Sequence, residues 1–214
     1  MTVNVGGNMV KRSGEEVTEE KKGWEVHKFG GSSLQKGDLF YQVSQILEST
    51  RSPKNASVVS AVYGVTDLLS IAANRAMEGK GIEESIAYLR NKHFDIIDDL
   101  FKNTSYERDL KERLEEDFLG LYQLLKTIEI SSFASETLIE VIMGYGEVWS
   151  AQILHKLLQS QGKESRWLNA RDVLYLRGNS SEREVDWELS QSKLKEKLKD
   201  FKGQYLIITG FVAS

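Results

Sequence analysis

The apolar residues of this chain alternate between two spacings, one typical of strands and the other typical of amphipathic helices. Residues 24–29 and 55–62 are short apolar runs, and the second contains consecutive valines, as a strand covered on both faces would require. Residues 36–50, between them, predict a helix. The apolar face of that helix would carry Leu39, Val43, Ile46 and Leu47. Residues 25–61 therefore predict a βαβ unit, and with it a parallel sheet.

The later pattern predicts two more strands, at 164–168 and 204–211, separated by helices. The expected helices are 66–78, 83–101, 107–128, 135–161 and 187–200. The second and third of these carry matching apolar stripes, so we expect them to pack as a hairpin. The fold class predicted is α/β with a largely parallel sheet.

Length and local composition predict the domain organisation. The 214 residues suit one medium domain or part of a larger one. Residues 1–23 are rich in charge and glycine, and they predict a disordered tail. Residues 24–214 would then form the folded part.

Charge and composition exclude several classes of partner. The chain has 28 Lys and Arg against 32 Asp and Glu, a net charge of -4, and no basic track, so nucleic acid is not an expected partner. No apolar run approaches the roughly 20 residues that cross a bilayer, so no membrane association is expected. The absence of cysteine rules out disulfides and thiolate metal sites and is weakly favourable to a cytoplasmic location. The 3 histidines are too scattered to suggest a metal site.

The first strand ends in an unusual turn, "HKFGGSS". Lys28 offers a cation, Gly30 and Gly31 would let the backbone approach a ligand with positive φ, and Ser32 and Ser33 could cap the next helix. Such a turn can hold a phosphoryl group, with the lysine neutralising its charge. The spacing differs from that of the common phosphate-binding loop, and an ordinary turn remains an alternative.

The second strand also ends in small and hydroxyl-bearing residues. Ser60 and Thr66 lie on either side of Gly64, so that one turn could present both hydroxyls to a small polar ligand. Thr66 could instead simply cap the following helix. Both interpretations are open.

Two polar residues fall within apolar stripes. Glu147 lies four residues after Met143 and four before Ala151, so a buried carboxylate is expected, with either a ligand ammonium or a lysine or arginine of the protein beside it. Gly144 and Gly146 precede it, as close approach of backbone or ligand would require. His93 holds a similar position between Leu89 and Ile97, where we expect a packed or hydrogen-bonded structural histidine.

Five motifs together resemble a known family. "VHKFGGSSL", "VVSAVYGVTDLL", "GYGEVWSAQIL", "WLNARDVL" and "LIITGFVAS" have the order and spacing found in aspartate kinases. The sequence is most similar to the kinase portion of bifunctional aspartate kinase/homoserine dehydrogenases of methionine and threonine synthesis, and the likeness covers residues 25–214. It implies the amino acid kinase fold, with a largely parallel sheet sandwiched by helices.

The resemblance also implies an activity and roles for particular residues. The activity is ATP-dependent, Mg²⁺-requiring phosphorylation of the L-aspartate side chain to 4-phospho-L-aspartate, the first step towards lysine, threonine and methionine, in a homo-oligomeric parent. Lys28 resembles the lysine that stabilises the transferring phosphoryl group, and Gly30 and Gly31 the turn beside it. Ser60, Thr66 and Phe211 resemble aspartate contacts, and Glu147 the carboxylate that holds the substrate ammonium.

The sequence also departs from the family pattern. Tyr63 stands where a small residue is frequent and could narrow the pocket, and Asn169 stands where aspartate is common. The family's "GRGGSD" segment and nucleotide-binding half would follow Ser214, so we expect only the N-terminal half of the fold, inactive by itself. The alternative function is a non-catalytic amino-acid-binding or regulatory module. The apolar residues 205–214 should form a central strand, but no later strand remains to cover its free side, which would leave an edge prone to pairing with other chains.

Overall fold

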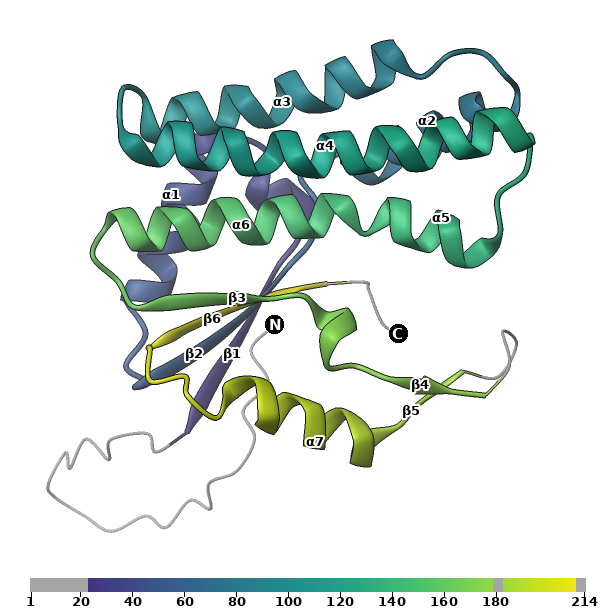
Figure 1. Cartoon of the computed structure of the whole chain (residues 1–214). Coiled ribbons are helices and arrows are strands. Elements are labelled where there is room, and N and C mark those ends of the chain that lie inside the picture. Colours follow the sequence, from purple (N-terminus) through teal and green to yellow (C-terminus); the bar gives the residue numbers. More distant parts are fainter. Residues whose placement is uncertain (1–22, 179–182, 211–214) are drawn as a thin grey trace, which may run out of the picture.

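The computed structural model describes residues 23–178 and 183–210, which form an α/β fold (Figure 1). Its main sheet contains β1 (Trp24–Phe29), β2 (Lys54–Val59), β6 (Tyr205–Thr209) and β3 (Ser165–Leu168), in that order. All three pairings are parallel, which confirms the expected sheet. Parallel strands bring their carboxyl ends to one edge, and that edge is where a ligand site is expected.

Helices cover both faces of this sheet, although unequally (Figure 1). Helices α1 (Gly37–Glu48) and α6 (Tyr145–Ser160) pack together on one side, and α6 contacts β2, β3 and β6. Helix α7 (Trp187–Leu198) lies on the opposite side. There a small apolar cluster joins Leu194 and Leu198 to Leu206 of the sheet. The expected sandwich is confirmed, with most of the core on the α6 side.

A second tier of helices packs outside α1 and α6. It consists of α2 (Val65–Met77), α3 (Glu83–Phe101) and α4 (Ser105–Ser131), whereas α5 (Glu136–Met143) continues the line of α6 (Figure 1). Helices α3 and α4 form the expected hairpin, and Thr104 begins α4 by accepting a hydrogen bond from the Glu107 N–H at 3.3 Å. Both predicted stripes are in the core. The hairpin thus adds a broad apolar layer above α6.

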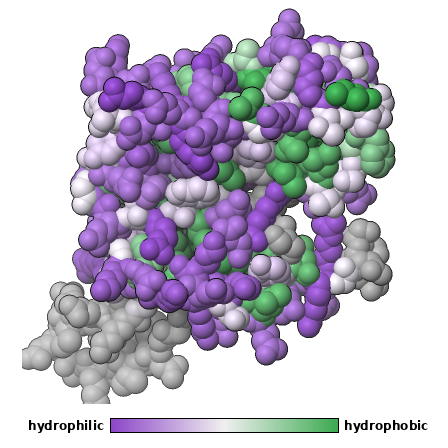
Figure 2. All heavy atoms as spheres, viewed as in Figure 1, coloured by the Kyte–Doolittle hydropathy of each residue, from purple (hydrophilic) through white to green (hydrophobic). Residues whose placement is uncertain are grey.

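The surface is mostly hydrophilic in the view of Figure 2. A hydrophobic area lies over the end of α4 and over α5, and exposed residues of this segment include Ile130 and Phe133. None of the helices in the described ranges has both the length and the apolar character needed to cross a membrane.

Three features differ most from the sequence prediction. The single helix expected at 135–161 is two helices, α5 and α6, separated by Gly144, because glycine is the weakest non-proline helix former. The strand expected at 55–62 ends at Val59, and the following residues form a loop beneath α6. Two short strands, β4 (Leu176–Arg177) and β5 (Glu184–Val185), pair antiparallel and were not predicted, because two residues carry no detectable alternation.

The prediction of an uncovered side on the last strand was wrong. β6 lies between β2 and β3, with both sides hydrogen-bonded. The chain inserts its last strand between two earlier ones, an arrangement that the order of elements along the sequence does not reveal. β6 therefore has no free edge at which another chain could pair, which was the basis of that prediction.

Candidate functional site

The carboxyl ends of three neighbouring strands are aligned at one edge of the main sheet. Lys28 of β1 is level with Val58 of β2, and Val59 is level with Thr209 of β6. The ladder continues past the strands, since the Ser60 N–H donates to the Phe29 carbonyl at 3.0 Å and the Gly210 N–H donates to the Val59 carbonyl at 2.8 Å. These hydrogen bonds fix the backbone on which the site is built.

A cavity of about 360 Å³ lies at this edge, and we call it the strand-end cavity. It is lined by Lys28, Val58, Val59, Ser60, Thr66, Glu147 and Gly210. Four residues singled out from the sequence, one cation, two hydroxyls and one carboxylate, therefore surround one space. Phe211, also singled out, lies outside the described residues.

Glu147 is the buried charge of this cavity. It lies in the first turn of α6 and is 3% exposed, and its Oε2 atom has no hydrogen-bond partner among the described residues. Burial raises the pKa of Glu147 to about 7, and the N–H groups of Glu147 and Ala61 and the charge of Arg171 act in the opposite direction. A carboxyl group held in this way gains from a cation placed in the cavity.

Tight backbone packing places Glu147 at the strand ends. A Cβ atom on Gly146 would lie 2.6 Å from the Ala61 Cβ and 3.0 Å from Val65 Cγ1, so a larger residue would push α6 away from the loop after β2. Gly64 begins α2 with a φ of 77°, a left-handed conformation that glycine adopts at little cost. The close approach expected at Gly146 is therefore between α6 and the loop after β2.

Thr66 and Ser60 belong to the same loop. Thr66 is the second residue of α2, whose N-cap is Gly64, so the interpretation of Thr66 as a helix cap was wrong. Its position inside the first turn lets it line the cavity while Ser60 lines it from the end of β2. The two hydroxyls therefore reach the cavity from either end of one loop.

The turn after β1 differs in detail from the prediction. Gly31 to Leu34 form a short 3-10 helix capped by Gly30, whose φ is -78°, and neither glycine is among the residues with positive φ. Ser32 and Ser33 lie inside this helix and do not cap it. A Cβ on Gly31 would approach the Ala61 carbonyl oxygen to 2.7 Å. The glycine is needed for contact with the second loop, and the turn's role toward a phosphate stays a prediction.

Lys28 also lines the cavity, and its side chain is exposed. The structure thus brings a cationic and an anionic side chain to one cavity, as the sequence argument required. No group of three or more His, Asp and Glu side chains able to hold a metal ion occurs within residues 23–178 and 183–210.

Sequence reasoning missed two residues near the site. Gly210 lines the cavity, although the prediction placed it inside a strand. Arg171 follows β3 in a short 3-10 helix, η2 (Ala170–Asp172), and its charge acts on Glu147. The sequence did carry one signal for Arg171, a cation three residues after the end of a predicted parallel strand.

His93 lies away from this cavity. Its ring is fully buried, and Nδ1 lies 2.7 Å from the Leu89 carbonyl oxygen. The ring centroids of Trp149 and Phe118 are 4.7 and 6.2 Å away. The expectation of a packed, hydrogen-bonded histidine is confirmed.

Comparisons with known proteins agree on a family. The model of the amino acid kinase family matches residues 23–214. A bifunctional aspartokinase/homoserine dehydrogenase of Daucus carota is 30% identical over 89% of this chain, and one of Escherichia coli is 28% identical over 90%. The chain spans only 21% and 23% of these two relatives.

Solved structures agree on the fold. Escherichia coli aspartokinase III, solved with lysine and aspartate, matches with a TM-score of 0.73 and 24% identity. The same enzyme with aspartate and ADP gives a TM-score of 0.72. Each match covers 88% of this chain and 41% of the solved chain. By its sequence, from residue 23 onward, this chain belongs to the amino acid kinase family.

Proposed function

We propose that this chain supplies the aspartate-binding part of an aspartate kinase, which phosphorylates the side-chain carboxylate of L-aspartate to 4-phospho-L-aspartate at the expense of ATP. The observation that carries the proposal is the buried Glu147 carboxylate, which faces a cavity that Lys28 also lines. The aspartokinase relatives support the choice of substrate.

Each lining group has a role in this proposal. Glu147 binds the ammonium of aspartate, and the Ser60 and Thr66 hydroxyls orient the bound amino acid. Lys28 offsets negative charge on the side-chain carboxylate and on the phosphoryl group as it transfers. ATP would supply the phosphoryl group and Mg²⁺ would offset the charge of its phosphates. The turn at Gly30, Gly31 and Ser32 begins two residues after Lys28.

Phosphoryl transfer depends almost entirely on alignment of donor and acceptor. The strand-end cavity accounts for the acceptor side of that alignment. We therefore expect residues 1–214 alone to bind L-aspartate without turning over ATP. Hydroxamate trapping of aspartyl phosphate by the purified chain would contradict this expectation.

Titration calorimetry with L-aspartate tests the pocket directly. Glu147→Gln should weaken binding roughly 10- to 100-fold, since a hydrogen bond between charged groups contributes about 1.5–3 kcal/mol. Glu136→Gln is the matched control, because Glu136 lies in the first turn of the neighbouring helix α5 and is exposed.

A ligand series makes the same test more specific. Succinate lacks the ammonium, so it should bind the wild-type chain more weakly than aspartate and should be insensitive to Glu147→Gln. Asparagine lacks the second carboxylate, so it should be insensitive to Lys28→Gln. Equal binding of aspartate by the wild-type and Glu147→Gln chains would rule out the proposed ammonium site.

A further inference from the structure

We propose that Arg171 is a positioning residue for this aspartate pocket, holding the junction between α5 and α6, and with it Glu147, against the carboxyl ends of β3 and β6. The inference rests on the proposed function, because it concerns the residue that binds the substrate ammonium. Arg171 does not line the strand-end cavity, so its action would pass through Glu147.

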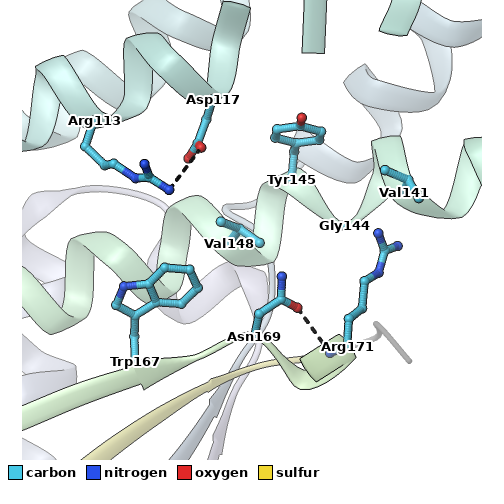
Figure 3. A pocket seen from close by; sticks show the side chains of 9 residues that line it. All are labelled: Arg113, Asp117, Val141, Gly144, Tyr145, Val148, Trp167, Asn169 and Arg171. Atoms are coloured by element: carbon cyan, nitrogen blue, oxygen red, sulfur yellow. Dashed lines mark hydrogen bonds and ion pairs between the residues drawn. The ribbon is translucent and has the colours of Figure 1, made fainter. Parts of the chain in front are cut away.

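The backbone of η2 is attached to the sheet. The Ala170 N–H donates to Thr209 Oγ1 at 2.8 Å in a buried hydrogen bond. The Asn169 side chain accepts from the Arg171 N–H at 3.2 Å (Figure 3). Thr209 precedes Gly210, which lines the strand-end cavity. η2 is therefore fixed relative to the strand ends that form the site.

The Arg171 side chain connects this anchored turn to the helices. It extends from η2 towards Gly144 (Figure 3). Its Nη2 donates a hydrogen bond to the Glu140 carbonyl at 2.6 Å. The Gly144 N–H donates to the same carbonyl at 3.1 Å, so the oxygen marks the last turn of α5. A guanidinium at a helix carboxyl end is also favoured by the helix dipole. Glu147 follows three residues after Gly144.

The junction borders open space on the side of η2. A second cavity of about 260 Å³, which we call the side cavity, lies between α4, the α5–α6 junction and β3 with η2 (Figure 3). Tyr145 and Val148 of α6 line it, together with Arg171. One turn of α6 therefore separates the two cavities. With open space beside the junction, the hydrogen bond from Arg171 takes the place of packed side chains.

Arg171 also acts on the charge of Glu147. Its positive charge lowers the pKa of the carboxyl group, against burial, which raises it. Lys28 lines the same strand-end cavity as Glu147. Glu140 on α5 and Tyr145 on α6 interact electrostatically with Arg171, as Glu147 does. A guanidinium stays protonated throughout the useful pH range. Arg171 thus favours the ionised form that binds an ammonium.

Four chains compared by calorimetry with L-aspartate between pH 6 and pH 8.5 test this role. Arg171→Gln should weaken binding about tenfold at pH 7 and less at pH 8.5, where Glu147 ionises without help. Arg171→Lys should restore the wild-type pH profile even if affinity stays lower. Arg183→Gln is the matched control, because the Arg183 side chain forms an ion pair with the side-chain carboxylate of Glu140 at 2.8 Å. This variant should leave aspartate binding within about twofold of wild type.

A measurement without substrate separates this inference from the proposed function. Carboxyl-carbon NMR should show Glu147 titrating at higher pH in Arg171→Gln than in the wild-type chain. If no chain binds aspartate but this shift appears, the proposed function fails and the coupling of Arg171 to Glu147 stands. An unchanged Glu147 titration, or a uniform loss of affinity at every pH, would overturn the positioning role through charge.

Discussion

His93 and Glu147 are both polar residues in apolar helical stripes, and both are buried, yet their surroundings differ. The His93 ring packs against Trp149 and Phe118, and its Nδ1 lies within hydrogen-bonding distance of a carbonyl of its own helix. Glu147 lies only two residues before Trp149, but it lines the strand-end cavity. Each residue has one buried atom without a hydrogen-bond partner among the described residues, His93 Nε2 and Glu147 Oε2, so the cavity is what distinguishes them. Helix α6 therefore packs one face, which carries Trp149, against the α3–α4 hairpin, and another face, which carries Glu147, borders the cavity at the sheet edge. We call the first the structural face and the second the chemical face.

The difference shows what separates a structural polar residue from a candidate ligand-binding one. Burial lowers the pKa of His93 to about 4 and raises that of Glu147 to about 7, so each is pushed towards its neutral form. His93 is fully buried, with the rings of Trp149 and Phe118 against its own. Around Glu147, Gly146 brings the loop after β2 close while the strand ends leave a cavity.

The largest effect should come from removing the packing on the structural face. Trp149→Ala should lower the free energy of unfolding by about 3–5 kcal/mol, because the indole is fully buried between helices. Trp187→Ala is the control, since Trp187 is 74% exposed and its loss should change stability by about 0.5 kcal/mol at most. Urea denaturation measures both. Equal effects would show that the layer around His93 is not a packed core.

Replacing Glu147 on the chemical face should raise the free energy of unfolding, whereas Trp149→Ala lowers it. A raised carboxyl pKa means that the folded state binds a proton more tightly than the unfolded state, so ionisation of Glu147 destabilises the fold as the pH rises from about 4.5 to 7. Glu147→Gln should therefore stabilise the chain at pH 8, by up to about 3 kcal/mol, at about 1.36 kcal/mol per pKa unit.

Denaturation of the Glu147→Gln chain at pH 5 and pH 8 checks the sign. The gain should shrink towards pH 5, where the wild-type carboxyl is protonated as well. Glu136→Gln, on the exposed first turn of α5, should show no gain at either pH. A gain that is the same at both values would mean that the charge of Glu147 is not its source.

Sequence could predict the parallel sheet, the hairpin and the buried position of both residues, because these follow from periodicity. It could also predict that Lys28, Ser60, Thr66 and Glu147 meet, because parallel strands end at one edge. It could not show that β6 enters between β2 and β3, since strand order depends on contacts between distant segments. Arg171 was missed for the same reason: its hydrogen bond to the Glu140 carbonyl spans 31 positions in the sequence.

The smallest expected effect is the difference between His93 and Glu147 in how each makes the stability of the fold depend on pH. The lowered pKa of His93 means that the unfolded state takes up the proton first, so this residue's contribution to stability is lost as the pH falls from about 6.5 towards 4. Glu147 contributes with the opposite sign over part of that range. Burial also lowers the pKa of His155 to about 4, so His155 changes stability with pH in the same direction as His93. Because every chain compared retains His155, its effect cancels from the comparison.

Between pH 6.5 and pH 5.5, each single linkage changes the free energy of unfolding by about 1 kcal/mol, because each group is only partly titrated in this window and the full slope of about 1.4 kcal/mol per pH unit is not reached. The stability of His93→Leu should therefore fall by about that much less than that of the wild-type chain, whereas the stability of Glu147→Gln should fall by about that much more. Only the change with pH is compared in urea denaturation, so loss of packing in His93→Leu does not affect the test. Opposite changes in the slope of stability against pH arise only if the folded state disfavours the proton on His93 and favours it on Glu147. If both variants changed that slope in the same direction, the contrast between a neutral, packed histidine and a carboxylate facing a cavity would be wrong.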